Sequence, residues 1–125
     1  MIYADNAATT EMDLEAFEAM RPFLLGKYGN ASQPYGLGVE AKKAIQNARG
    51  IIAECIGATP EEIYFTSGGT ESDNWAIKCG CGNNGDIVTS VIEHHAVLNS
   101  CKTQERAGRV VRYISVSKTG EIAPD

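Results

Sequence analysis

Apolar side chains recur at helical intervals through the first part of the chain. Over residues 13–25 they stand at positions 14, 17, 20 and 24, and Gly26 follows where such a helix would end. Pro22 lies inside this pattern and predicts a kink or an early end. Over residues 39–56 a longer apolar stripe is closed by Gly57. The chain is therefore predicted to begin with two helices joined by a polar loop.

From about residue 59 onward, short apolar runs alternate with helical segments. Strands are predicted over residues 63–66, 87–92 and 109–116, and helices over residues 71–79 and 95–106. This alternation is typical of right-handed βαβ units in a mostly parallel sheet. The predicted fold class is α/β, with a helical part over about 1–58 and a sheet-forming part over about 59–125. Ligands of such sheets bind beyond the carboxyl ends of the strands.

Length, composition and charge exclude several classes of function. The 125 residues suffice for one domain at most. With 16 acidic and 11 basic residues, a net charge of −5 and no basic run longer than two, a nucleic-acid partner is not expected. No apolar stretch is long enough to span a membrane, and the first ten residues lack the features of a secretory signal. The four cysteines are therefore expected as free thiols in a cytoplasmic protein.

The turn at residues 67–71, with the sequence SGGTE, joins a predicted strand end to a predicted helix start. Two consecutive glycines there permit unusual backbone angles and a close approach of the backbone to a ligand. The N–H groups of Gly68, Gly69 and Thr70, with the Thr70 hydroxyl, predict an anion site at the helix start. The alternative is a well-capped helix, with Ser67 or Thr70 as the cap and Glu71 near its positive end.

Two histidines, His94 and His95, follow the next predicted strand on the same edge of the sheet. A histidine there can stack on a flat ligand and carry protons near neutral pH. Adjacent side chains point in different directions, so at most one of the two is expected to face a site. The alternative is that both begin the next helix and face solvent.

Two other motifs are rejected. Cys79 and Cys81 lack the CxxC spacing of a zinc site, so no metal is expected. The string GCGNNG at residues 80–85 matches the dinucleotide-binding pattern G-x-G-x-x-G. It follows a helix and precedes a strand, which is the reverse of the arrangement that binds pyrophosphate.

Four stretches together resemble the N-terminal part of the cysteine desulfurases, which are pyridoxal 5'-phosphate (PLP) enzymes of aminotransferase class V and fold type I. The resemblance covers essentially the whole chain, in the family's order. The stretches are YADNAATT at 3–10, YGNASQPYGLG at 28–38, FTSGGTESDNWAIK at 65–78 and TSVIEHHAVL at 89–98.

The resemblance implies roles for five residues of this sequence. Gly69 and Thr70 would hold the PLP phosphate, and His94 would stack over the pyridine ring and assist proton transfer. Asn6 and Ala7 would lie at the substrate end of the site. It also implies that residues 1–58 belong to the small domain and its N-terminal helices, and residues 59–125 to the start of the PLP-binding large domain.

The activity that the resemblance implies is removal of sulfur from L-cysteine. The sulfur would remain as a persulfide on an enzyme cysteine, and L-alanine would be released. A sulfur acceptor, either an iron–sulfur scaffold protein or a tRNA-thiolation protein, would take the sulfur from there. The family's enzymes are homodimers.

Three parts of the family's machinery lie beyond position 125: the Schiff-base lysine, the acidic partner of the pyridine nitrogen and the persulfide cysteine. Within this chain, Lys78 lies about 12 Å along its helix from Thr70, which disqualifies it as a substitute. Lys27 lies in a loop, and the sequence does not exclude it as a substitute for the Schiff-base lysine. The chain is therefore expected to be a truncated N-terminal third that is inactive alone.

The sequence leaves the subfamily undecided and leaves other assignments than a cysteine desulfurase possible. Many relatives have a proline after the Asn30 equivalent and a histidine where Tyr35 stands, so the subfamily is undecided. A selenocysteine lyase, or another class V lyase or aminotransferase, fits the same motifs. A non-catalytic split half that pairs with a complementary chain fits them too.

Overall fold

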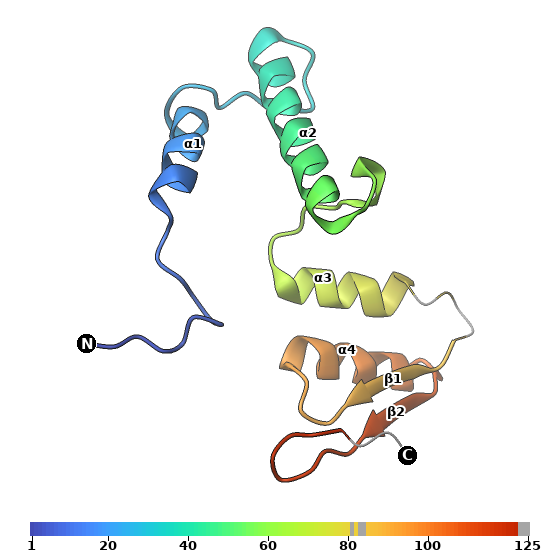
Figure 1. Ribbon diagram of the computed structural model, residues 1–125. Helices are drawn as coiled ribbons and strands as arrows, with labels where there is room; N and C mark the ends of the chain where they lie inside the picture. Colours follow the sequence, from blue (N-terminus) through green and yellow to red (C-terminus); the bar gives the residue numbers. More distant parts are fainter. Residues whose placement is uncertain (81, 83–84, 123–125) are drawn as a thin grey trace. The chain divides into compact units, whose positions relative to one another are not determined.

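The computed structural model describes residues 1–80, 82 and 85–122 of the chain (Figure 1). The chain divides into two compact units, Met1–Tyr64 and Phe65–Asp125. The sequence predicts a division at about residue 58, six residues earlier. The assignment of the two parts to a small domain and a PLP-binding domain stays a prediction.

The first helix, α1, covers Leu14–Leu25. Asp13 caps it, because its carboxylate accepts the backbone N–H groups of Glu15 at 2.8 Å and Ala16 at 3.2 Å. Pro22 does not end the helix early, and the N–H of Gly26 donates to the Pro22 carbonyl at 3.0 Å. The predicted helix over residues 13–25 is thus confirmed with Asp13 as its cap.

The second helix, α2, covers Gly36–Ile56 and begins three residues before the predicted start. Glycine is a poor helix former, so the residues at 36 and 38 do not predict this first turn from the sequence. At the other end Gly57 adopts a left-handed conformation with φ 68°, and the N–H of Ala58 donates to the Ala53 carbonyl at 2.9 Å. This pair of features is a glycine C-cap that uses the otherwise unpaired carbonyls of the last turn.

A short 3₁₀ turn, η1 (Pro60–Glu62), follows. The Glu62 carboxylate accepts the N–H of Thr59 at 2.8 Å and its hydroxyl at 3.2 Å, which forms a capping box. Residues 63–66 form no strand, although the sequence predicts one there. Ile63 does have extended angles, φ −97° and ψ 125°, but the sheet in the described part of the chain consists of residues 87–90 and 111–114. The strand prediction is wrong for this structure.

The second unit contains one β-α-β crossover. Strand β1 (Ile87–Ser90) leads into helix α4 (His95–Arg106), which returns to strand β2 (Val111–Ile114). The two strands pair in parallel, with Ile87 opposite Val111 and Ser90 opposite Ile114. Helix α4 begins and ends at the predicted residues, whereas both strands are shorter than predicted. The predicted α/β class with parallel pairing is confirmed.

Helix α3 (Gly69–Trp75) precedes this crossover and packs along α4 (Figure 1). It starts two residues before the predicted helix. It continues as a π-helical turn, η2 (Ala76–Gly80), so the predicted helical extent to about residue 79 is confirmed, whereas the π-helical form was not predicted. Residues 81 and 83–84 of the rejected motifs lie outside the described residues.

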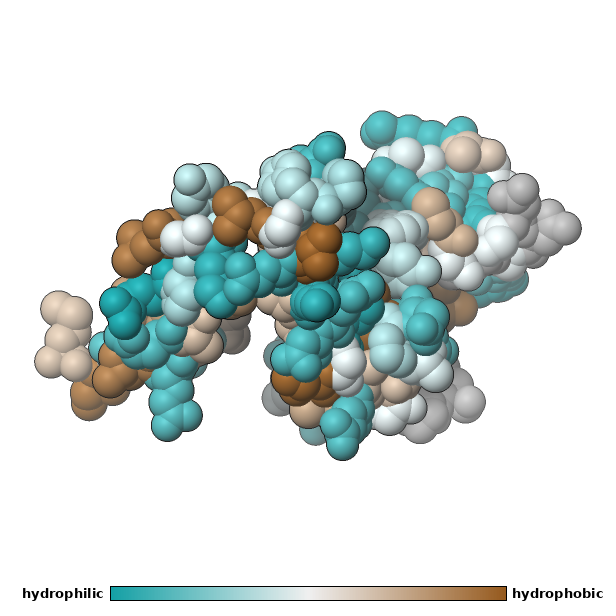
Figure 2. All heavy atoms as spheres, turned by 90° about the horizontal axis from the view of Figure 1, so that it is seen from above, coloured by the Kyte–Doolittle hydropathy of each residue, from teal (hydrophilic) through white to brown (hydrophobic). Residues whose placement is uncertain are grey.

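Few of the described side chains are buried in either unit. The buried apolar residues are Ala53 and Ile63 in the first unit and Ile87, Ala96 and Cys101 in the second. None of the 12 residues of α1, all of them described, is buried, and Leu14 and Leu25 are 72% and 74% exposed. Figure 2 shows such apolar side chains lying at the surface. Apolar area in water is unfavourable, so burying these side chains against a further surface would be favourable.

In the described part of the chain, no helix combines the length and the apolar character that a membrane crossing requires.

Candidate phosphate-binding turn

The double-glycine turn lies immediately before α3. Gly68 is the N-cap, with φ 159° and ψ 177°, and Gly69 is the first helical residue. A Cβ built on Gly69 would meet no atom within 4 Å. Neither a positive φ nor packing in the described chain therefore requires glycine at position 69, where it costs the helix up to about 1 kcal/mol relative to alanine. An approaching ligand would explain it.

The turn offers donors that have no acceptor among the described residues. Within the described residues, the N–H groups of Gly68, Gly69 and Thr70 and the Thr70 hydroxyl donate no hydrogen bond. The first N–H groups of any helix lack partners inside it, and the helix dipole adds a partial positive charge there. The carbonyl of Thr70 is occupied, since the amide of Asn74 donates to it at 2.8 Å. These groups fit an anion such as phosphate.

Side-chain hydrogen bonds also cross this turn. One oxygen of the Glu71 carboxylate accepts the Ser67 N–H at 2.6 Å and the Ser67 hydroxyl at 2.7 Å. Ser67 therefore does not cap α3, contrary to one alternative from the sequence. The hydroxyls of Thr66 and Ser72 meet at 2.7 Å beside the Gly68 carbonyl. Thr66 and Ser72 were not predicted to take part, although a hydroxyl residue stands on each side of the two glycines in the sequence.

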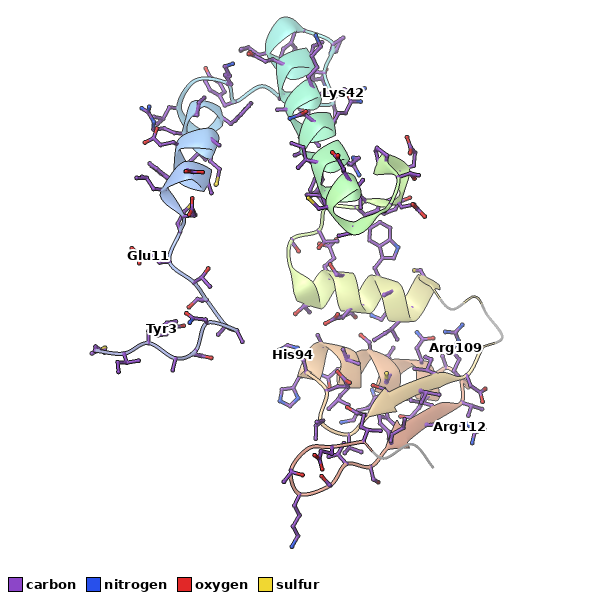
Figure 3. All side chains as sticks on the ribbon, viewed as in Figure 1. Tyr3, Glu11, Lys42, His94, Arg109 and Arg112 are labelled. Atoms are coloured by element: carbon purple, nitrogen blue, oxygen red, sulfur yellow. The ribbon has the colours of Figure 1, made fainter. Side chains whose placement is uncertain are left out.

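His94 occupies the N-cap position of α4. Its Nδ1 accepts the backbone N–H of Ala96 at 3.1 Å, so the neutral ring carries its proton on Nε2. The His95 ring lies 6.3 Å away, centroid to centroid, and is tilted by 55°. Capping thus accounts for His94 structurally, and the residue is exposed at the start of α4 (Figure 3).

The second unit brings the glycine turn and His94 to the same end. Helices α3 and α4 pack against each other, and both begin on the same side in Figure 1. Gly69 and Thr70 thus stand at the start of one of two packed helices, and His94 caps the other. Their roles toward PLP stay predictions.

Asn6 and Ala7 belong to the first unit, where residues 6–8 form a turn. The N–H of Ala8 donates to the Asp5 carbonyl at 3.0 Å. Both residues are exposed. Their predicted place at the substrate end of the site stays a prediction.

The two lysines considered in the sequence differ in surroundings. Lys27 Nζ lies 2.6 Å from the Glu40 carboxylate and 6.0 Å from the centre of the Phe23 ring, so it is engaged within the first unit. Lys78 lies in the π-helical turn η2. Neither observation supports a lysine of this chain as the one that binds PLP covalently.

Two other kinds of site were considered. Over residues 1–80, 82 and 85–122, no three His, Cys, Asp or Glu side chains come close enough to share a metal ion. Cys81 is outside that range. An open groove of about 410 Å³ in the first unit is lined by Gln46, Arg49, Pro60 and Glu61. Its Arg49 already donates to the Ile63 carbonyl, and the groove contains no residue of the predicted site.

We expect the hydrogen bonds that Glu62 accepts from Thr59, and those that Glu71 accepts from Ser67, to open in acid. The Thr59 N–H, and then its hydroxyl, hold the pKa of Glu62 below its usual value, and the Ser67 N–H and hydroxyl do the same for Glu71. A lowered folded pKa means that the stabilisation is complete above the ordinary value of 4.5 and is lost as the pH falls below it. Amide exchange at Thr59 and Ser67, followed by NMR, should accelerate below about pH 4.5 relative to the intrinsic rate. Unchanged protection at pH 2–3 (roughly two units below the usual glutamate pKa) would contradict this.

The chain resembles proteins of known family throughout its length. The aminotransferase class-V family model matches residues 2–125. A cysteine desulfurase, IscS, of Methanosarcina thermophila is 49% identical over 99% of this chain and 32% of its own length. A solved NifS-like protein matches 89% of this chain and 32% of its own, with 39% identity and a TM-score of 0.82. The structure of SspA in complex with cysteine matches 94% of this chain and 35% of its own, with 38% identity and a TM-score of 0.84.

The predicted resemblance to the cysteine desulfurases is thereby confirmed. The chain spans about a third of the length of the curated relatives that it matches.

Proposed function

Since the chain belongs to the aminotransferase class-V family, we propose that it supplies the phosphate-binding part of the PLP site of a cysteine desulfurase. The single observation that carries this proposal is the turn at Gly68–Gly69–Thr70. There, three N–H groups and a hydroxyl have no acceptor within the described residues, and Gly69 faces open space. The relatives' names and the match over residues 2–125 favour PLP as the anion's source.

The residues present fit the cofactor. Gly68, Gly69 and Thr70 would hold its phosphate, and His94 would lie against its ring. When bound, PLP withdraws electrons from the carbon skeleton of the substrate amino acid. The protein's task is then to orient the cofactor and to manage protons. The Nδ1 atom of His94 accepts a hydrogen bond from the Ala96 N–H, which fixes the orientation of the ring. The Nε2 atom carries an exchangeable proton and is the atom that would take part in proton transfer.

The proposed overall reaction transfers sulfur from L-cysteine to a thiol of the enzyme. The carbon–sulfur bond of cysteine breaks, the Cβ gains a proton, and L-alanine leaves. The sulfur stays on the enzyme cysteine as a persulfide, so one cysteine and one thiol yield one alanine and one persulfide. The reacting cysteine and the covalent lysine lie in sequence other than these 125 residues.

We further propose a cytoplasmic homodimer that passes its sulfur to an acceptor or iron–sulfur scaffold protein. The relatives named cysteine desulfurase support a role in supplying sulfur. The exposed apolar faces of α1 and α2 support a larger assembly, whether that covering surface is further sequence or a second subunit.

The direct test uses the complete gene product that contains this chain. With L-cysteine and a thiol acceptor, it should release alanine and transferable sulfur in equal amounts. Preference for L-selenocysteine would favour a selenocysteine lyase instead. If a purified preparation always contains a second polypeptide that carries the PLP-linked lysine, the split-half alternative is correct.

Substitutions at His94 separate its two roles. His94→Asn retains an N-cap and should leave stability nearly unchanged, whereas His94→Ala should lose about 1 kcal/mol. Both should weaken PLP binding about three- to tenfold, because an aromatic contact is worth roughly 0.5–1.5 kcal/mol. Urea unfolding and PLP titration measure the two effects. If His94→Asn binds PLP as the wild type does, the ring has no cofactor role.

A further inference from the structure

We draw no further inference here: the strongest candidate, the exposed apolar surface patch of α1 in the first unit, where Leu14, Leu24 and Leu25 are 72%, 62% and 74% exposed, carries no proposal because nothing in the described residues shows what covers it.

Discussion

Gly69→Ala is expected to weaken PLP binding ten- to hundredfold while leaving the chain as stable as before or slightly more so. The added methyl group meets no atom of the described chain within 4 Å, so the fold has room for it. Alanine is also the better helix former, by up to about 1 kcal/mol. The methyl group would instead displace the phosphate and remove a charge-assisted hydrogen bond worth roughly 1.5–3 kcal/mol. PLP titration and urea unfolding of the same samples measure both quantities.

Gly50→Ala serves as the control for this substitution. Gly50 lies within α2, and a Cβ there also meets nothing within 4 Å. This variant should gain stability by up to about 1 kcal/mol and bind PLP normally. An unchanged PLP affinity in Gly69→Ala would mean that no phosphate approaches that face of the turn.

The second large effect is on folding. Gly38→Ala should destabilise the first unit by about 3 kcal/mol, at the upper end of the usual cost of overpacking. Its Cβ would lie 2.4 Å from the Gln33 carbonyl oxygen and 2.5 Å from that of Asn30, and backbone atoms cannot give way as a flexible side chain can. The loop before α2 and the start of the helix would have to separate. Urea unfolding, with the α2 amides followed by NMR, measures the loss.

Gly36→Ala is the matched control two residues earlier in the same helix. A Cβ at Gly36 meets nothing within 4 Å, so stability should stay within about 1 kcal/mol of the wild type. Similar stability for the two variants would show that the close backbone contact at Gly38 does not exist in solution.

Local signals were sufficient for helices with clear ends. Helix α4 was predicted over its full extent, because His94 precedes an amphipathic run that ends near Gly108. The start of α2 was predicted three residues late. Gly36 and Gly38 are typical of a loop, and only the contact between Gly38 and the backbone of the preceding loop explains a glycine inside that helix.

Features that depend on distant partners could not be predicted from local patterns. The apolar run at residues 63–66 has the composition of a strand, but a strand exists only when another strand pairs with it. The π-helical turn Ala76–Gly80 has no local signature. The roles of Gly69, Thr70 and His94 toward a cofactor stay predictions, whereas the hydrogen bonds between Ser67 and Glu71 depend on side-chain geometry that only the structure shows.

The central claim is that the double-glycine turn binds the phosphate of PLP. The most direct measurement compares two titrations of the ¹⁵N-labelled chain, one with PLP and one with pyridoxal, which lacks the phosphate. We predict that the amide signals of Gly68, Gly69 and Thr70 move with PLP and stay in place with pyridoxal. Equal movement with both compounds, or none with PLP, would contradict the account.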